Sequence, residues 1–275
     1  FNMMGYDLAV FGNHEFDKDQ EILTDRVEQS LYPWLGANVV LEGTDWDLPE
    51  WNKAYEILDL GEGDNAVKLG IIGVATEETP EVTLIGTTEG LVFKDLTETI
   101  LHYYDEVLAQ ADALIVVAHM GTEDSGPYDG LVTVADALIR AGKPVDLMIG
   151  GHQHQAISTP VYVGDTAIVS AGYYGRYLGR VDVTINAATK ELAVEKYHLY
   201  TITQPTITFQ SLVAEVEALY EAGEIRGRGI YRGLLDTLAA AQTAYDGGND
   251  DAAVKLLKVF VVKVMTSRVR AISVD

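Results

Sequence analysis

The sequence predicts a layered α/β domain over residues 1–204, followed by a small helical tail over residues 205–275. Three observations support this prediction. Apolar runs alternate with amphipathic helical segments from about residue 5 to 201, which is typical of α/β folds. A chain of 275 residues that is 48% hydrophobic can bury a full core. Beyond residues 204–205 the strand-like runs cease and helical periodicity takes their place.

In the α/β part, three apolar runs end in a polar break. Residues 7–11 lead into Gly12, residues 112–118 into His119, and residues 145–149 into Gly150. Further strands are predicted at residues 54–59, 67–74, 167–171, 181–186 and 192–200. The last two strands alternate in polarity across a short turn, which predicts an antiparallel pair with one face toward solvent. Helices are predicted at residues 17–29, 96–110 and 130–142, and Asp17 could cap the first.

The tail is predicted to contain three helices, at residues 209–222, 233–245 and 250–267, with a glycine-rich joint at residues 223–233. The last two helices each carry an apolar stripe: Leu234, Leu238, Ala241 and Tyr245 on one, and Val254, Leu257, Val261 and Val264 on the other. These stripes predict that the two helices pack on each other as an αα-hairpin. Docking of a partner onto the tail is the alternative.

The composition and net charge of the sequence exclude several classes of function. The formal charge of −23 argues against a nucleic-acid partner, since phosphate backbones would be repelled. There is no cysteine, which excludes disulfides, thiolate metal sites and a cysteine nucleophile. No run approaches the roughly 18 apolar residues of a membrane span. Because the chain starts at Phe1 with what resembles the end of a helix, we expect it to be a fragment of a longer protein.

Four of the six histidines lie in the segments that follow the three apolar runs. The segments read Gly-Asn-His-Glu-Phe-Asp at residues 12–17, Ala-His-Met-Gly at 118–121 and Gly-Gly-His-Gln-His at 150–154. Open α/β sheets form their sites at the carboxyl ends of the strands, so these side chains should meet at one edge. Imidazole nitrogens and amide oxygens suit divalent transition metals. Two such ions about 3.5–4 Å apart assist phosphate ester hydrolysis.

These segments resemble the later blocks of the calcineurin-like metallophosphoesterase family: Gly-Asn-His-Asp/Glu, a lone histidine after a strand, and Gly-His-x-His. Residues 12–17 and 171–182 are similar to the 5′-nucleotidase branch in particular. The resemblance covers roughly residues 1–201 and implies an α/β/β/α sandwich. It further implies that Asn13, His119 and His152 bind the second of two metals, and that His154 completes the first.

The same resemblance assigns the catalytic pair. His14 would lie beside the scissile phosphate, stabilise the transition state and protonate the leaving oxygen, while Asp17 would orient the His14 ring. The nucleophile would be a metal-bound water. Glu15 is expected to be structural, and Arg176 is a candidate phosphate-facing cation.

The sequence also departs from the family's pattern. The Asp-x-His and Gly-Asp-x-x-Asp blocks, which supply the first metal's Asp and His and the bridging carboxylate, do not occur in it. We expect them upstream in an N-terminally truncated catalytic domain, so the chain alone should be nearly inactive. The family's nucleotidases also carry a C-terminal domain whose aromatic residues stack on the nucleotide base, and the helical tail of this sequence does not resemble it.

The expected function of the complete protein is hydrolysis of phosphate monoesters, chiefly nucleoside 5′-monophosphates, with two divalent ions (Zn, Mn, Fe or Co). A cyclic-nucleotide phosphodiesterase, a nucleotide-sugar hydrolase and a degenerate non-catalytic binding module are the alternatives. The nucleotidase branch implies a secreted, periplasmic or cell-surface location.

Overall fold

The computed structural model describes residues 2–63, 66–186, 188–202 and 208–269, with side chains described as far as residue 264. The chain divides into two compact units, residues 1–203 and residues 204–275. Each unit is described by itself.

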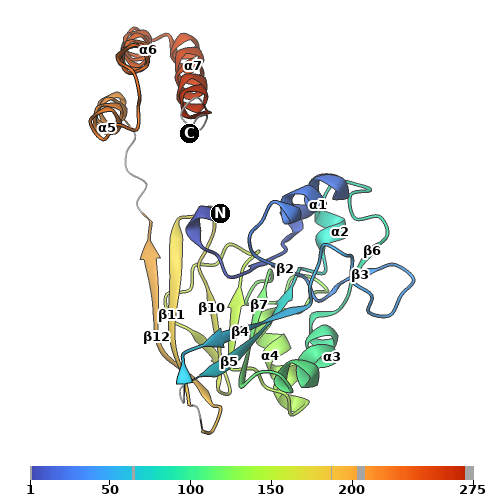
Figure 1. Cartoon of the computed structure of the whole chain (residues 1–275). Helices are drawn as coiled ribbons and strands as arrows, with labels where there is room; N and C mark the ends of the chain where they lie inside the picture. The colour runs from blue at the N-terminus through green and yellow to red at the C-terminus, as the bar shows by residue number, and fades with distance from the viewer. Residues whose placement is uncertain (1, 64–65, 187, 203–207, 270–275) are drawn as a thin grey trace. The chain divides into compact units, whose positions relative to one another are not determined.

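A six-stranded sheet forms the centre of the first unit (Figure 1). Its strands, in spatial order, are β4 (Tyr55–Leu60), β5 (Val67–Val74), β7 (Ala113–Ala118), β8 (Leu147–Gly150), β10 (Thr166–Ser170) and β9 (Val161–Val163). The four inner strands are parallel to one another, whereas β4 and β9 pair antiparallel at the two edges. Inner strands covered on both faces are almost wholly apolar, which is why they were recognisable as continuous runs. The predicted α/β fold is confirmed.

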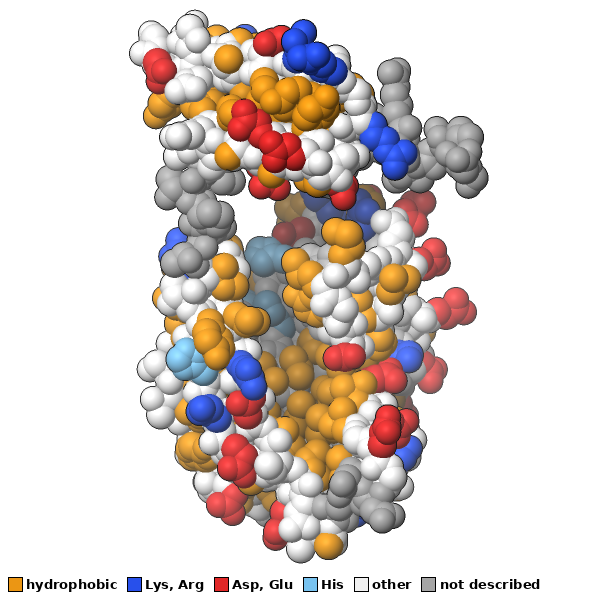
Figure 2. Space-filling model, turned by 60° about the vertical axis from the view of Figure 1, so that its left-hand side comes forward, with side chains coloured by type: hydrophobic (Ala, Val, Ile, Leu, Met, Phe, Trp, Pro, Cys, Tyr) orange, Lys and Arg blue, Asp and Glu red, His pale blue; other side chains and the backbone are white. Residues whose placement is uncertain are grey.

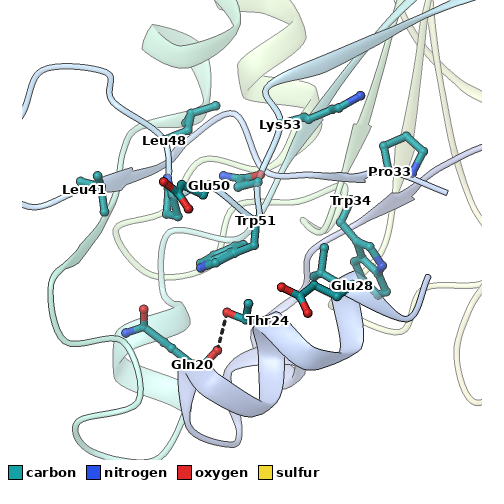
Figure 3. A pocket seen from close by; sticks show the side chains of 13 residues that line it. Gln20, Thr24, Glu28, Pro33, Trp34, Leu41, Leu48, Glu50, Trp51 and Lys53 are labelled. Carbon is teal, nitrogen blue, oxygen red and sulfur yellow. Dashed lines mark hydrogen bonds between the residues drawn. The ribbon is translucent and has the colours of Figure 1, made fainter. Parts of the chain in front are cut away.

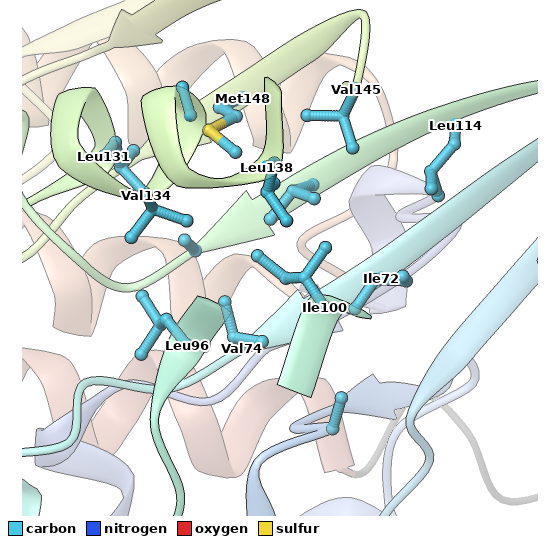
Figure 4. Packing of buried hydrophobic residues seen from close by; sticks show 14 of the residues in the cluster. Ile72, Val74, Leu96, Ile100, Leu114, Leu131, Val134, Leu138, Val145 and Met148 are labelled. Atoms are coloured by element: carbon cyan, nitrogen blue, oxygen red, sulfur yellow. The ribbon is translucent and has the colours of Figure 1, made fainter. Parts of the chain in front are cut away.

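Helices α3 (Leu96–Leu108) and α4 (Leu131–Arg140) cover one face of this sheet. Figure 4 shows their apolar side chains meeting those of the strands. The buried contacts include Ile100, Leu138 and Met148, each fully inaccessible to solvent. Asp95 begins α3 by accepting a hydrogen bond from the Glu98 amide at 2.7 Å, which satisfies one of the free N–H groups of the first turn.

Two pairs of strands pack on the opposite face. β1 (Ala9–Val10) and β2 (Trp34–Leu35) form a short parallel pair, and β11 (Tyr177–Ile185) and β12 (Leu192–Thr201) form an antiparallel hairpin. The hairpin confirms the predicted antiparallel pair, and Figure 1 shows it on the side of the sheet away from α3 and α4. On the face drawn in Figure 2, hydrophobic side chains line a hollow of this unit.

The remaining elements of the first unit are short. They are η1 (Asn2–Met4), η2 (Asn13–Phe16), α1 (Gln20–Glu28), α2 (Thr79–Val82) and the antiparallel pair β3 (Val39–Leu41) and β6 (Leu91–Phe93). The prediction that Asp17 caps the first helix is wrong. The helix begins at Gln20 after Asp19, because the Asp17 carboxylate bonds to the His14 ring and not to helix N–H groups.

The second unit holds α5 (Phe209–Glu221), α6 (Arg228–Asp246) and α7 (Asp250–Val269), which share one cluster around Leu234, Leu238 and Phe260. Helix α6 begins earlier than predicted, so Gly229 and Gly233 are helical and not part of a joint. Each glycine costs a helix about 1 kcal/mol relative to alanine. Packing of the apolar side chains at Ile230 and Tyr231 offsets that cost.

The predicted apolar stripe of α7 is partly wrong. Val254 and Val261 are 49% and 53% exposed, whereas Ala253 and Phe260 are buried. The buried face is rotated because the Phe260 ring removes more apolar surface from water than a valine can. None of the described helices is long and apolar enough to cross a membrane.

Candidate active site

Asn13, His119 and His152 come together at the carboxyl edge of the sheet. Asn13 is in η2, just after β1, while His119 follows β7 directly and His152 follows β8. Asn13 Oδ1 lies 3.0 Å from His119 Nε2, and the His119 and His152 ring centroids are 5.1 Å apart. Histidine side chains are visible set back in a hollow of this unit in Figure 2.

Gly12 makes room for the His119 ring. A Cβ placed on Gly12 would lie 2.7 Å from His119 Cε1, closer than side chains tolerate. A Cβ on Gly151 would lie 3.4 Å from His119 Nδ1. Glycine at position 12 is therefore required by the close approach of the backbone to the imidazole, whereas a side chain at position 151 would make an ordinary contact.

The environment of His119 keeps its imidazole neutral. Burial, together with the smaller effects of the nearby rings of His152, His14 and His154, lowers the pKa of His119 to about 4. A neutral imidazole offers a lone pair to a metal ion without first losing a proton.

His14 and Asp17 form a hydrogen-bonded pair at the surface. His14 Nδ1 lies 2.8 Å from Asp17 Oδ2, and the His14 side chain is 73% exposed. The neighbouring Glu15 accepts a hydrogen bond from the Gly12 amide at 2.8 Å. Burial raises the pKa of the Glu15 carboxyl group.

His154 lies against aromatic rings. Its ring stacks on Tyr173, with centroids 4.6 Å apart and planes inclined by 17°, and also contacts Tyr174. No direct contact between His154 and Asn13, His119 or His152 is found among the described residues. Arg176 contacts the same Tyr173 ring: its Nη1 donates to Tyr173 Oη at 2.8 Å, and its guanidinium is 4.7 Å from the Tyr173 ring centre.

The loop after β8 is locally strained. His152 and His154 both adopt the left-handed backbone conformation, with φ of 61° and 59°. Such angles cost a non-glycine residue about 1–2 kcal/mol, and they concentrate at functional sites. Gln153, between them, donates through Nε2 to the Glu123 carbonyl oxygen at 2.9 Å, which ties the loop to the segment after β7.

Glu78 is a site residue that the sequence reasoning missed. Its Oε1 contacts Nε2 of His152, 74 residues away, within hydrogen-bond distance. The available signal was the polar sequence Thr76-Glu77-Glu78, which follows β5 at the same edge of the sheet.

The Asn13 oxygen and the histidine nitrogens are chemically suited to a divalent ion, but by themselves they provide only part of a metal site. Among the described residues, no group of three or more His, Cys, Asp or Glu side chains is arranged to hold a metal. Asn13 supplies an amide oxygen instead, 3.0 Å from the neutral His119 nitrogen. Amide oxygen and imidazole nitrogen are both suitable ligands for Zn, Mn, Fe or Co.

A separate pocket of about 710 Å³ lies between α1 and the segment around residues 41–53 (Figure 3). Trp34 and Trp51 line it together with Glu28 and Glu50. None of the predicted site residues lines this pocket, so it is distinct from the histidine site.

Two histidines follow neighbouring parallel strands of the central sheet, and Asn13 joins them from the layer above it. This arrangement is that of an α/β protein with a polar site suited to a metal ion. Within that class, the model of the calcineurin-like phosphoesterase family matches residues 3–156, more than half of the chain. The chain belongs to the calcineurin-like phosphoesterase family. A second model, the FIMAH domain, matches residues 209–274.

Individual relatives agree with this assignment. A 5′-nucleotidase from Vibrio cholerae is 28% identical over 218 residues, which cover 71% of this chain and 38% of the relative. The cell wall protein Lmo0130 from Listeria monocytogenes is 25% identical over 281 residues, covering 91% of this chain and 34% of that protein. The solved structure of a 5′-nucleotidase precursor from Thermus thermophilus shares the fold, with a TM-score of 0.58 at 22% identity, covering 80% of this chain and 44% of that one. The chain thus spans less than half the length of these proteins.

Proposed function

We propose that the protein containing this chain hydrolyses phosphate monoesters, and that nucleoside 5′-monophosphates are its substrates. The approach of Asn13 Oδ1 to His119 Nε2 at 3.0 Å, beside His152, is the observation that carries the proposal. Membership of the calcineurin-like phosphoesterase family and the 5′-nucleotidase relatives support the reaction and the substrate class.

Calcineurin-like phosphoesterases generally use divalent metals. We propose that Asn13, His119 and His152 hold one ion and that His154 contributes to a second. Bound divalent ions lower the pKa of water and neutralise charge on phosphoryl oxygens. This local positive charge matters because a protein with a formal charge of −23 repels an anionic substrate at long range.

His14 supplies a proton in this proposal. Asp17 Oδ2 lies 2.8 Å from Nδ1, which fixes the orientation of the ring and leaves Nε2 outside this hydrogen bond. A protonated Nε2 can donate to the leaving oxygen as the ester bond breaks. Arg176, which lies beside Tyr173, is the nearby cation proposed to meet the phosphate.

The test is phosphate release from nucleoside 5′-monophosphates by the natural protein that contains this sequence. We expect activity that a chelator abolishes and a divalent cation restores. His14→Ala should lower kcat by about 10²–10⁴-fold, the usual contribution of general acid–base catalysis, with unchanged metal content. His198→Ala, at an exposed position of β12, is the matched control and should leave activity intact.

Two outcomes would contradict parts of this proposal. Absence of metal-dependent activity in the natural protein, with His14→Ala indistinguishable from wild type, would favour a non-catalytic binding module. The 275-residue chain alone should be nearly inactive, because His154 is the one ligand of the first metal that we assign within it and the bridging carboxylate is missing from it. Normal turnover by this chain would refute that assignment of ligands. We also propose a location outside the cytoplasm, supported by the relative named as a cell wall protein.

A further inference from the structure

The contact between Glu78 and His152 is one of two histidine–carboxylate pairs at the site, and the proposed reaction does not use it. The two side chains are only 17% and 15% exposed, respectively, whereas the His14 side chain of the other pair is 73% exposed. An ionised carboxylate can only accept hydrogen bonds, so the proton in this contact belongs to Nε2 of His152. A neutral His152 ring therefore carries its lone pair on Nδ1.

The position of Glu78 is fixed by its neighbours along the chain. Glu77 accepts a hydrogen bond from the Leu96 amide at 2.9 Å, at the start of α3. Thr79 is fully buried, and its hydroxyl donates to the Thr76 carbonyl oxygen at 2.6 Å. The Glu78 carbonyl oxygen accepts from the Glu81 amide at 2.8 Å. With both flanking residues bound, the Glu78 carboxylate is presented from a rigid segment.

The His152 ring is constrained from the opposite side by its own backbone. Its φ of 61° sets the direction in which the side chain leaves the loop. The His119 ring lies 5.1 Å away, inclined by 57°. Glu78 occupies Nε2, so Nδ1 is the one ring nitrogen left to face a ligand among the described contacts of His152.

We propose that Glu78 is a positioning residue that selects the His152 tautomer with a free Nδ1, which makes Nδ1 the atom that binds the metal. This inference rests on the proposed metal site. The carboxylate would also make the imidazole a stronger donor, as carboxylate partners of metal-bound histidines do. Glu78 acts through His152 and is not itself a ligand.

The first measurement needs no metal. Long-range ¹H–¹⁵N spectra of the 275-residue chain, with His152 assigned by a His152→Gln variant, report which ring nitrogen carries the proton. They are recorded at a pH above which the ring signals no longer move. We expect the proton on Nε2 in the wild type and in Glu78→Gln, whose amide oxygen can accept the same hydrogen bond. In Glu78→Ala, both tautomers should be present.

The second measurement is zinc binding by calorimetry. We expect Glu78→Ala to weaken binding by about 10–100-fold, the usual effect of removing such a partner. Glu78→Gln should weaken it less. Glu81→Gln is the matched control, because Glu81 lies three residues further along, in α2, but accepts from Tyr128 Oη at 2.6 Å, away from His152. It should change neither the spectra nor the affinity.

Three results would overturn the inference: a proton on Nδ1 in the wild type, an unchanged tautomer in a folded Glu78→Ala variant, or a loss of zinc affinity in Glu78→Gln as large as in Glu78→Ala. The last would make Glu78 a direct ligand. If no variant binds zinc but the tautomer still depends on Glu78, the metal assignment fails while the positioning of His152 by Glu78 stands.

Discussion

The left-handed backbone at His154 predicts that glycine at this position gives a more stable protein than alanine does. His154→Ala and His154→Gly both remove the ring that stacks on Tyr173, so comparing them isolates the Cβ atom. At a φ of 59°, that Cβ costs about 1–2 kcal/mol. Glycine, in turn, loses about 0.4–1 kcal/mol more conformational entropy on folding than alanine. The net expectation is that the glycine variant is more stable than the alanine variant by roughly 0.5–1 kcal/mol.

His198 provides the matched comparison. It is exposed on β12, outside the residues with positive φ, so glycine there should be less stable than alanine by about 0.5–1 kcal/mol. The sign of the glycine-minus-alanine difference should therefore reverse between the two positions. Subtracting the glycine-minus-alanine difference at position 198 from that at position 154 cancels the conformational entropy of glycine. What remains is the backbone strain of alanine at position 154, about 1–2 kcal/mol.

Urea unfolding followed by tryptophan fluorescence measures both differences. All three tryptophans, Trp34, Trp46 and Trp51, lie in the first unit, so the signal reports that unit and not the helical one. Equal m-values among the four variants are required for the comparison. If alanine proved more stable than glycine at His154 as well, the reasoning from backbone strain would be refuted.

Two further predictions concern packing. Gly12→Ala places a methyl group 2.7 Å from the His119 ring, so it should destabilise the first unit by about 1–3 kcal/mol and weaken zinc binding. Zinc calorimetry measures the second effect, and a wild-type affinity would contradict the close approach of the backbone to the ring. Phe260→Ala should cost the second unit about 3–5 kcal/mol, whereas Val261→Ala next to it should stay within about 0.5 kcal/mol, because only the phenylalanine is buried. Thermal unfolding followed by the helical circular dichroism signal measures the stability of the two variants. Similar losses of stability in Phe260→Ala and Val261→Ala would mean that the packed face of α7 is wrongly assigned.

Much of the site could be anticipated because it depends on strand ends. The runs before His119 and Gly150 identified the inner strands β7 and β8, whereas the run before Gly12 forms the short, half-buried strand β1 of the other layer. The parallel strands β7 and β8 end at a common edge of the central sheet, and from this the proximity of His119 and His152 followed. Asn13 reaches the same place from β1, which belongs to a separate two-stranded sheet. Periodicity likewise located α3 and α4 to within a few residues.

Other features could not be read from local pattern. Asp17 could serve as a helix cap or as a partner for His14, and only the position of the imidazole decided between them. In α7, the sequence predicted an apolar stripe that includes Val254 and Val261, whereas packing with α5 and α6 buries the face that contains Phe260.

The sequence by itself determined which strands are buried, which polar side chains follow them, and the family to which those segments belong, because these depend on residue type and spacing. The tertiary structure alone decided that Glu78 meets His152 across 74 residues and that His154 stacks on Tyr173. Such pairings arise from how separate loops turn at the sheet edge, including the left-handed residues of the loop after β8, and no local periodicity encodes that geometry.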